Sequence, residues 1–486
     1  MSNKARTIVT TDGEVDDMNS FLRYLLYSDS FDTEGIVLTS SVYHYAGNGE
    51  NGIDPFRWTG TEWINEYIDL YAQVYNNLKI HSSEYPSPDY LKSIYHVGNI
   101  ESPGEMTKET AGSKFIEDYL VNDQDSRKLY IQTWGGTNTT ARALKSIEEK
   151  YADKPNWESL KRRIEEKVII YIILDQDETY SEYIAKNWDI EVINDRFNFW
   201  YFAYAWKMVE PELALKLQPK WQLHLRDNFG PLLKKYALIG DGNILDGELE
   251  EEQRGIDLYL DKNPDYARYD FISEGDSPSF FYLLNNGLRN SENPQFGGWG
   301  GRFEVVDGTR KYINSAMDYN PYNQRYESQY TLTRWFDDIQ DDFKGRASWC
   351  TAESFDDAAH YPLVKIIGGE DIFVHPGEAI EIRTFASDLN NRSLAFKWWH
   401  YHEASSYQSN PKVEGNEFES MGLLFGKVSE KFEKPPLDRV KITNDKKDKV
   451  QITIPKDIQT GETIHIILEV TNGTLTTYKR VILTAK

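Results

Sequence analysis

The feature that most constrains the fold is the stretch Ile8–Asp17, where a strand pattern ends abruptly in a cluster of acids. β-Branched residues fill its first four positions, and the pattern breaks at Asp12-Gly13. Three aspartates and one glutamate then fall within six residues, and apolar residues at helical spacing follow. Such acids repel one another unless a cation lies among them, and a hard divalent cation such as Ca²⁺ or Mg²⁺ prefers oxygen ligands. The alternative is that Asp16 and Asp17 cap the helix, whose N-terminus favours anions.

Further strand patterns alternate with helical ones through the first part of the chain. They cover residues 34–39, 129–133, 168–174 and 188–193. This alternation predicts right-handed βαβ units and an open, mostly parallel sheet. In such sheets ligands bind at the carboxyl ends of the strands. Acids that follow separate strands, such as Asp12 and Asp177, are therefore expected at one edge.

The pattern changes near residue 360. From Pro362 onward, seven short β-rich runs separated by turns predict an all-β immunoglobulin-like sandwich. We therefore expect two domains, residues 1–360 and 361–486. Trp398 and Trp399 are neighbours on one predicted strand and point to opposite faces, so at least one belongs to a core. We expect this region to pack against the first domain, with carbohydrate stacking as the alternative.

Bulk properties exclude several classes of partner. The net charge of −24 argues against a nucleic acid or an anionic membrane surface. No apolar run approaches the roughly 18 residues of a membrane span. The single cysteine, Cys350, excludes an intramolecular disulfide and a thiolate metal cluster. The 13 Trp, 32 Tyr and 22 Phe include rings of the kind that stack on sugar faces, although most are expected to serve the core, so their number does not identify a partner.

Location and assembly are less constrained. The first residues lack the apolar region of a signal peptide, and a strand begins almost at once. We expect a periplasmic or secreted protein whose signal peptide has been removed. The sequence leaves the oligomeric state open, and an oligomer is compatible with it.

Three motifs carry a resemblance to the nucleoside hydrolases. VTTDGEVDD at 9–17 resembles their DxDxGxDD signature, and TWGGTN at 133–138 resembles their second conserved loop. Gly275-Asp276 resembles their late His-Asp pair. The longer motifs WGGTNTTARAL, LDQDET, EGDSPSFFYLL and GGWGGRFE resemble a narrower nucleoside-hydrolase-like family of bacterial polysaccharide degraders, some labelled cellulose-binding. That resemblance implies a nucleoside-hydrolase-like domain followed by a β-sandwich.

The resemblance also implies a site. A Ca²⁺ ion would be held by Asp12, Asp17, the carbonyl of Thr133 and Asp276. Asp12 is the candidate general base for water attack at an anomeric carbon, and Asp16 holds a ring hydroxyl or shares that role. Inverting hydrolysis also needs an acid on the opposite face, for which the candidates are Asp177, Glu274 and Glu304. The predicted substrate-binding residues are His44, Asn48, Trp134, Asn138, Gln176, Glu274, Trp299 and Glu304.

The sequence departs from the nucleoside hydrolase pattern on the substrate side. Thr10 and Glu14 replace an acid and a glycine of the signature, and Gly275 replaces the histidine that protonates a purine. We therefore expect a calcium-dependent glycoside hydrolase that acts on a glycan or oligosaccharide. The alternatives are a non-catalytic carbohydrate-binding protein and a true nucleoside N-ribohydrolase.

Overall fold

The computed structural model describes residues 4–407 and 434–486. At its centre is an eight-stranded sheet with the strand order β3-β2-β1-β4-β5-β6-β8-β7. Its neighbours pair in parallel, except for the antiparallel pair β7 and β8. The strands are β1 (Ala5–Thr11), β2 (Phe31–Leu38), β3 (Tyr95–Val97), β4 (Leu129–Thr133), β5 (Val168–Ile173), β6 (Glu191–Asp195), β7 (Glu304–Val305) and β8 (Lys311–Ile313). The predicted mostly parallel α/β sheet is confirmed.

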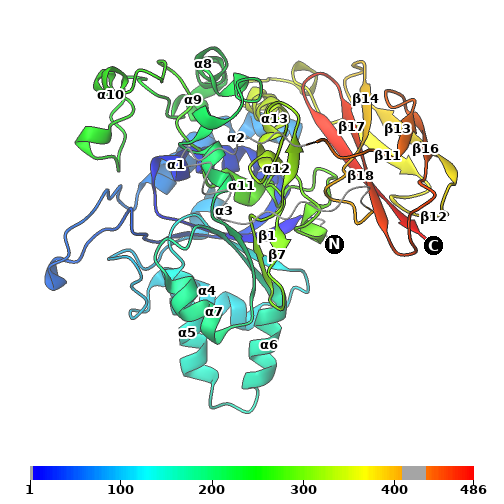
Figure 1. The fold of residues 1–486 in the computed structure, drawn as a ribbon. Helices are drawn as coiled ribbons and strands as arrows, with labels where there is room; N and C mark the ends of the chain where they lie inside the picture. Colours follow the sequence, from blue (N-terminus) through cyan, green and yellow to red (C-terminus); the bar gives the residue numbers. More distant parts are fainter. Residues whose placement is uncertain (1–3, 408–433) are drawn as a thin grey trace.

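Helices cover both faces of this sheet (Figure 1). Adjacent strand residues point to opposite faces, so Ile8 packs in one apolar core and Val9 in the other. Burial on both faces explains why a central strand such as β5 is continuously apolar. On the Ile8 side lie α4 (Ala111–Asn122), α5 (Asn138–Tyr151) and α6 (Trp157–Lys167); on the Val9 side lie α1 (Val15–Tyr27), α2 (Trp63–His81), α11 (Ser277–Phe281) and α13 (Phe336–Trp349). Shorter elements include α3 (Pro88–Ser93), α7 (Ala185–Asn187), α8 (Pro219–Asn228), α9 (Gly230–Lys234), α10 (Asp257–Lys262), α12 (Tyr330–Thr333), β9 (Asp318–Asn320) and β10 (Arg325–Glu327).

The strand order reverses between β1 and β4, so a crevice forms at their carboxyl ends. The turn after β1 begins with Asp12, and the loop after β4 contains Gly135. A Cβ atom at Gly135 would lie 2.8 Å from the Cβ of Asp12. The glycine therefore allows the two strand-end turns to touch.

The C-terminal region contains two four-stranded sheets, β11-β13-β16-β15 and β12-β18-β17-β14. Their pairs are antiparallel except for β12 and β18. Apolar side chains such as Ile382, Val450 and Ile466 form a core of this region. The predicted β-rich C-terminal region is confirmed. Its strands are β11 (Leu363–Ile367), β12 (Asp371–Val374), β13 (Ala379–Ser387), β14 (Ala395–His400), β15 (Lys441–Thr443), β16 (Lys449–Thr453), β17 (Thr463–Thr471) and β18 (Thr476–Ala485).

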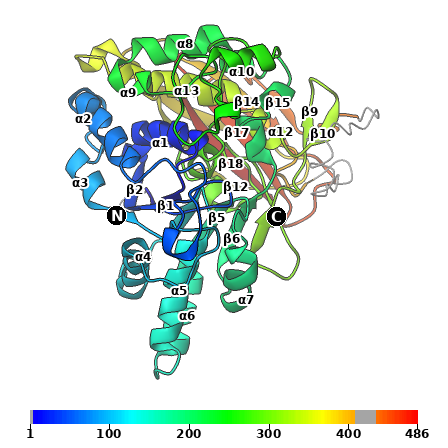
Figure 2. The same cartoon turned by 90° about the vertical axis from the view of Figure 1, so that its left-hand side faces the viewer.

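Besides its own core, the C-terminal region contributes side chains to the core of the α/β part. Trp398 packs inside the C-terminal region, whereas the ring of Trp399 lies 6.0 Å from that of Trp335 in the α/β part. This confirms that the two tryptophans face opposite ways and that one packs against the first region. Both views show the C-terminal strands beside α12 and α13 (Figures 1 and 2). The boundary at 360/361 stays a prediction. None of the described helices combines the length and apolar character needed to cross a bilayer.

Candidate metal centre

Four aspartates from separate segments meet at the carboxyl edge of the sheet. Asp12 follows β1, Asp16 and Asp17 lie in the first turn of α1, and Asp276 precedes α11. None is more than 7% exposed. Carboxylate oxygens of Asp16, Asp17 and Asp276 lie within 4.8 Å of one another. The backbone N–H of Asp12 donates to Oδ1 of Asp17 over 3.2 Å, which brings the fourth acid to the group.

The donor set of this cluster fits a hard cation. Among the described residues, Oδ2 of Asp12, Oδ1 of Asp16 and Oδ2 of Asp276 are buried without a hydrogen-bond partner. A buried carboxylate oxygen that lacks a partner is unfavourable, so three of them among these neighbouring acids point to a missing positive group. All of the candidate ligand atoms are oxygens, as Ca²⁺ and Mg²⁺ prefer. The group formed by Asp16, Asp17 and Asp276 can therefore hold a metal ion.

The same crowding changes the protonation of the acids. Burial, followed by the charge of Glu14, raises the pKa of Asp12 to about 7. Burial and neighbouring carboxylates also raise the pKa of Asp16, Asp17 and Asp276 well above the usual range. A divalent cation would compete with these protons, so binding of a metal and loss of protons are coupled.

Helix capping does not account for this cluster. The N-cap residue of α1 is Glu14, and its side chain makes no bond to the helix amides. Asp17 accepts hydrogen bonds from the hydroxyl of Thr11 and the N–H of Asp12, both at the end of the strand. Asp17 therefore connects the first turn of α1 to the end of β1.

Polar side chains lie around Glu14, beside the acid cluster. Tyr204 donates its hydroxyl to Glu14 over 2.9 Å, and Nδ1 of His44 lies 3.8 Å from the other oxygen of Glu14. The pKa of His44 is lowered, chiefly by burial, so the ring is neutral near pH 7. The half-exposed Tyr43 has a raised pKa. Partial burial is the main cause, and the nearby charges of Glu14 and Asp12 raise the pKa further. The sequence predicted His44, but it gave no spacing that linked Tyr204 or Tyr43 to the acids.

Gln176 and Asp177 line a cleft of about 840 Å³ beyond the ends of β5 and β6. Tyr43 lines the same cleft, which connects it with the surroundings of the acid cluster. Asp177 accepts the backbone N–H groups of Thr137 and Asn138 over 3.2 and 3.0 Å, so it also caps α5. The full lining is Val42, Tyr43, Pro103, Leu174, Asp175, Gln176, Asp177, Glu178, Tyr180, Ser181, Asn194, Arg196 and Lys311.

Three other predicted substrate-binding residues take part in loop and helix contacts. Asn48 caps a short helical turn and donates to Glu101. Asn138 donates to Ser40 and to a backbone carbonyl and accepts from a threonine. Glu304 lies in β7 near Arg302. Any contact with a substrate would come in addition to these bonds, and it stays a prediction.

Trp134, Trp299 and Glu274 are also predicted substrate-binding residues, and all three are buried in the α/β core. Trp134 and Trp299 are at most 2% exposed, and Trp134 donates its indole N–H to Ser279 over 2.8 Å. Glu274 is fully buried and accepts two bonds from the guanidinium of Arg23, over 2.5 and 2.8 Å. Thr133 is also fully buried. It lies opposite Thr10 in the sheet, and Thr10 is two residues before Asp12 in the chain. Its carbonyl as a metal ligand stays a prediction, as do the substrate contacts of the other three.

Gly275 brings the backbone close to the acids. A Cβ atom at this position would lie 2.7 Å from Oδ2 of Asp16 and 3.2 Å from the Cβ of Ala203. A larger side chain here would need Asp16 to move. Gly275, which stands in place of the histidine of the late His-Asp pair, therefore leaves the space that Asp16 occupies.

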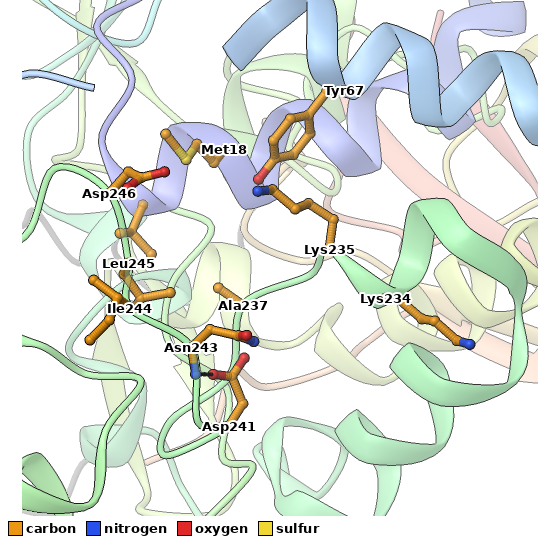
Figure 3. Close-up of a pocket in the computed structure, with 11 residues that line it drawn as sticks. Met18, Tyr67, Lys234, Lys235, Ala237, Asp241, Asn243, Ile244, Leu245 and Asp246 are labelled. Carbon is orange, nitrogen blue, oxygen red and sulfur yellow. Dashed lines mark hydrogen bonds between the residues drawn. The ribbon is translucent and has the colours of Figure 1, made fainter. Parts of the chain in front are cut away.

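A separate hollow of about 200 Å³ lies beside the first turns of α1, next to residues other than the acids (Figure 3). Val15 and Met18 line it, whereas Asp16 and Asp17 do not. Figure 3 shows the side chain of Lys235 pointing toward Tyr67 across this hollow. The hollow is thus distinct from the acid cluster although both use the same helical turn.

Comparison with known proteins assigns this architecture to a family. The model described as "Cellulose-binding Sde182, nucleoside hydrolase-like domain" matches residues 6–303, and "Cellulose-binding protein Sde0182, C-terminal domain" matches residues 379–485. The chain belongs to this Sde182 family, which has a nucleoside hydrolase-like N-terminal domain and a distinct C-terminal domain. The resemblance found in the sequence is therefore confirmed. No curated protein matches the chain.

One solved structure supports the fold, and two others match with low scores. A nucleoside hydrolase-related hypothetical protein from Saccharophagus degradans, described as associated with carbohydrate metabolism, matches over 100% of both chains at 22% identity with a TM-score of 0.70. The effector protein XOO4466 matches 72% of this chain and 94% of its own, at 10% identity and a TM-score of 0.38. The type III effector XopQ, solved with adenosine diphosphate ribose, matches 72% of this chain and 95% of its own, at 8% identity and a TM-score of 0.37.

Proposed function

We propose that the chain is a calcium-dependent glycoside hydrolase that acts on a glycan or oligosaccharide. The observation that carries the proposal is the buried group of Asp16, Asp17 and Asp276, with Asp12 hydrogen-bonded to Asp17 beside it and three carboxylate oxygens among the four residues that lack partners. The family description as cellulose-binding, and the association of the Saccharophagus protein with carbohydrate metabolism, support a sugar as the ligand. The cleft lined by Tyr43, Tyr180 and several polar groups offers a surface suited to sugar rings and hydroxyls.

In this proposal the aspartates of the cluster hold the metal ion and the substrate, and Asp177 acts from the neighbouring cleft. Asp17 and Asp276, with the carbonyl of Thr133, would hold the Ca²⁺ together with Asp12. When bound, such an ion draws substrate hydroxyls into place and makes a neighbouring water easier to deprotonate. Asp12 accepts the proton from the attacking water, because its remaining oxygen has no other donor. Asp16 holds a ring hydroxyl through its unpartnered Oδ1, and Asp177 is the predicted proton donor to the leaving group.

A non-catalytic carbohydrate-binding protein is the second candidate, and one observation favours it. The predicted proton donors already have partners: Asp177 caps α5, Glu274 is paired with Arg23, and Glu304 lies near Arg302. Without an acid for the leaving group, the acid cluster would serve as a sugar anchor. Nucleoside hydrolysis has less support, because Gly275 leaves no group there to protonate a base.

Calcium titration of the Asp17→Asn variant tests the metal assignment. The amide oxygen can still accept from Thr11 and Asp12, so the turn is kept while one ligand charge is lost. We expect calorimetry to show Ca²⁺ binding to the wild type and at least tenfold weaker binding to the variant. In EDTA the variant should melt at a higher temperature than the wild type, because one charge has left a repulsive cluster. The exposed Asp261→Asn change, which removes the same charge elsewhere, should match the wild type in both measurements.

A substrate screen separates the three functions. Aryl glycosides, plant and algal oligosaccharides, inosine and uridine are incubated with Ca²⁺ or with EDTA. Glycan products that form only with Ca²⁺ and are lost in Asp12→Asn support the hydrolase. Oligosaccharide binding without products after long incubation supports the binding protein, and release of a free base supports the nucleosidase.

A further inference from the structure

Two histidines and an aspartate converge at an edge of the C-terminal region, far from the acid cluster in sequence. His400 is the last residue of β14, His402 follows it closely, and Asp438 precedes β15. Nδ1 of His400 lies 3.3 Å from Oδ1 of Asp438, and Nε2 of His402 lies 3.5 Å from Oδ2. One candidate ligand atom from each residue lies within 4.8 Å of the other two.

Hydrogen bonds around His400 fix the orientation of its ring. The hydroxyl of Ser405 donates to the carbonyl of Tyr401 over 2.9 Å and accepts the N–H of His465 over 2.9 Å. Its oxygen lies 3.0 Å from Nε2 of His400, so it can accept from Nε2–H of the neutral ring. In that tautomer the lone pair of the ring lies on Nδ1, which faces the Asp438 carboxylate. Two acceptors then face each other, an arrangement that a cation between them would stabilise.

The alternative cation is a proton. It would make His400 an imidazolium, although this side chain is only 1% exposed and burial disfavours that charge. His402 also approaches the second oxygen of the same carboxylate, so three groups that can each ligate a metal converge here. A metal ion held by all three would account for both approaches at once.

The spacing of the three groups suits a tetrahedral shell. Ligands about 2.0–2.1 Å from a zinc ion lie about 3.3 Å apart in such a shell. The 3.3 Å from Nδ1 of His400 to Oδ1 of Asp438 is close to that value, and Nε2 of His402 lies 3.5 Å from the other oxygen of the carboxylate. Imidazole and carboxylate ligands together favour Zn²⁺ and related transition-metal ions over Ca²⁺. The Asp438 side chain is 45% exposed, so water can complete the shell.

We propose that His400, His402 and Asp438 form a structural site for a divalent transition-metal ion such as Zn²⁺. Ser405 orients His400, as groups behind metal-bound histidines do, and the N–H of Val440 holds Oδ1 of Asp438 over 2.9 Å. β14 and β15 are the edge strands of the two different C-terminal sheets. The ion therefore ties one sheet to the other at an edge where no backbone ladder joins them among the described residues.

Zinc titration of the full-length chain in excess Ca²⁺ tests this proposal. The protein is stripped with EDTA, and the excess Ca²⁺ competes for the acid cluster while ZnCl₂ is added. We expect about one equivalent of zinc to remain after gel filtration, and zinc to raise the melting temperature. His402→Gln and Asp438→Asn should each weaken zinc binding by more than about tenfold and abolish the rise in melting temperature.

The matched control is His375→Gln, which removes an exposed histidine from the same region. It should bind zinc as the wild type does. Absence of retained zinc in the wild type would overturn the proposal, as would equal zinc affinity in the wild type and both cluster variants. Circular dichroism checks folding, and Asp438→Asn keeps the test valid if His402→Gln does not fold, because Asp438 is largely at the surface. Loss of calcium binding in Asp17→Asn would leave this zinc result unchanged, so the two sites are tested independently.

Discussion

Glu274 and Asp276 are two positions apart and equally buried, yet their carboxylates are in opposite situations. Glu274 accepts from Arg23, from Ser277 and from the hydroxyl of Tyr236, so its charge is neutralised and its oxygens are occupied. Asp276 has an oxygen with no partner, and its nearest charged neighbours are other acids. At the scale of single residues, the available partners decide whether a buried acid stabilises the fold or awaits a cation.

Asp195 gives a prediction about pH at this scale. It is fully buried and accepts the N–H groups of Asn198 and Phe199 and the hydroxyl of Tyr171, and burial raises its pKa to about 6. The folded state therefore binds this proton more tightly than the unfolded state, so the free energy of unfolding falls as pH rises from about 4 to about 6. The total change from this group is about 3 kcal/mol.

The Asp195→Asn variant should lack that part of the pH dependence. Its amide oxygen can accept the two N–H groups, and its NH₂ can donate to Tyr171. Urea unfolding at several pH values measures the difference between the two proteins. The prediction is contradicted if the variant loses stability between pH 4 and 6 as steeply as the wild type does.

Much of the acid cluster was predictable from the sequence, and the limits of that prediction are physical. Asp12 follows β1, whose end lies at one edge of a parallel sheet, so its strand pattern was enough to find it, whereas Asp276 was found by the resemblance of its motif. The contact of Glu14 with Tyr204 depends on how residues 197–206 fold over the sheet, which no local pattern records. The pairing of Arg23 with Glu274 joins positions 251 residues apart, so it could not be derived from spacing.

Among the elements, α5 shows how a strand-end residue can support a neighbouring helix. Asp177 follows β5, and its oxygens accept the first N–H groups of α5, at Thr137 and Asn138. A carboxylate at a helix N-terminus satisfies donors that have no partner within the helix. Asp177, the predicted general acid, therefore connects the lining of the cleft to the N-terminus of α5.

Replacing Asp177 by alanine should lower the free energy of unfolding by about 1–2 kcal/mol, because the cap is lost. Asp177→Asn should retain most of the stability, since its amide oxygen still accepts. Denaturant unfolding of both variants is compared with glycan turnover. Loss of turnover in Asp177→Asn with normal stability would assign it the acid role, whereas normal turnover would leave it a cap alone.

Across the whole molecule, the C-terminal region is joined to the α/β part by more than surface contact. Tyr401, Ile467 and Tyr478 belong to the same apolar core as α1 and α13. The N–H groups of Tyr478 and Arg480 in β18 donate to the carbonyls of Asn286 and Gly287 in the α/β part, each over 3.0 Å. The two regions are therefore expected to unfold together.

Calorimetry should show a single unfolding transition in which the α/β part and the C-terminal region unfold together. Arg480 is fully buried and donates to the carbonyls of Leu288 and Gly297, over 2.6 and 2.8 Å. Arg480→Met should lower the stability by about 3 kcal/mol or more, because both carbonyls lose their donor, and the single transition should shift without splitting. Lys479→Met, a neighbour on β18 whose ion pair with Glu370 lies near the surface, should change stability by less than about 1 kcal/mol. Two separate transitions in the wild type would contradict this account.

The close approach of Gly275 to Asp16 has a consequence for redesign of this fold. A side chain at position 275 cannot be added unless Asp16, an acid of the cluster, shifts, since even a methyl group would lie 2.7 Å from its oxygen. A histidine introduced there would therefore have to be accommodated by a second element, the first turn of α1. A directed-evolution library aimed at purine nucleosides should accordingly vary positions 16 and 275 together.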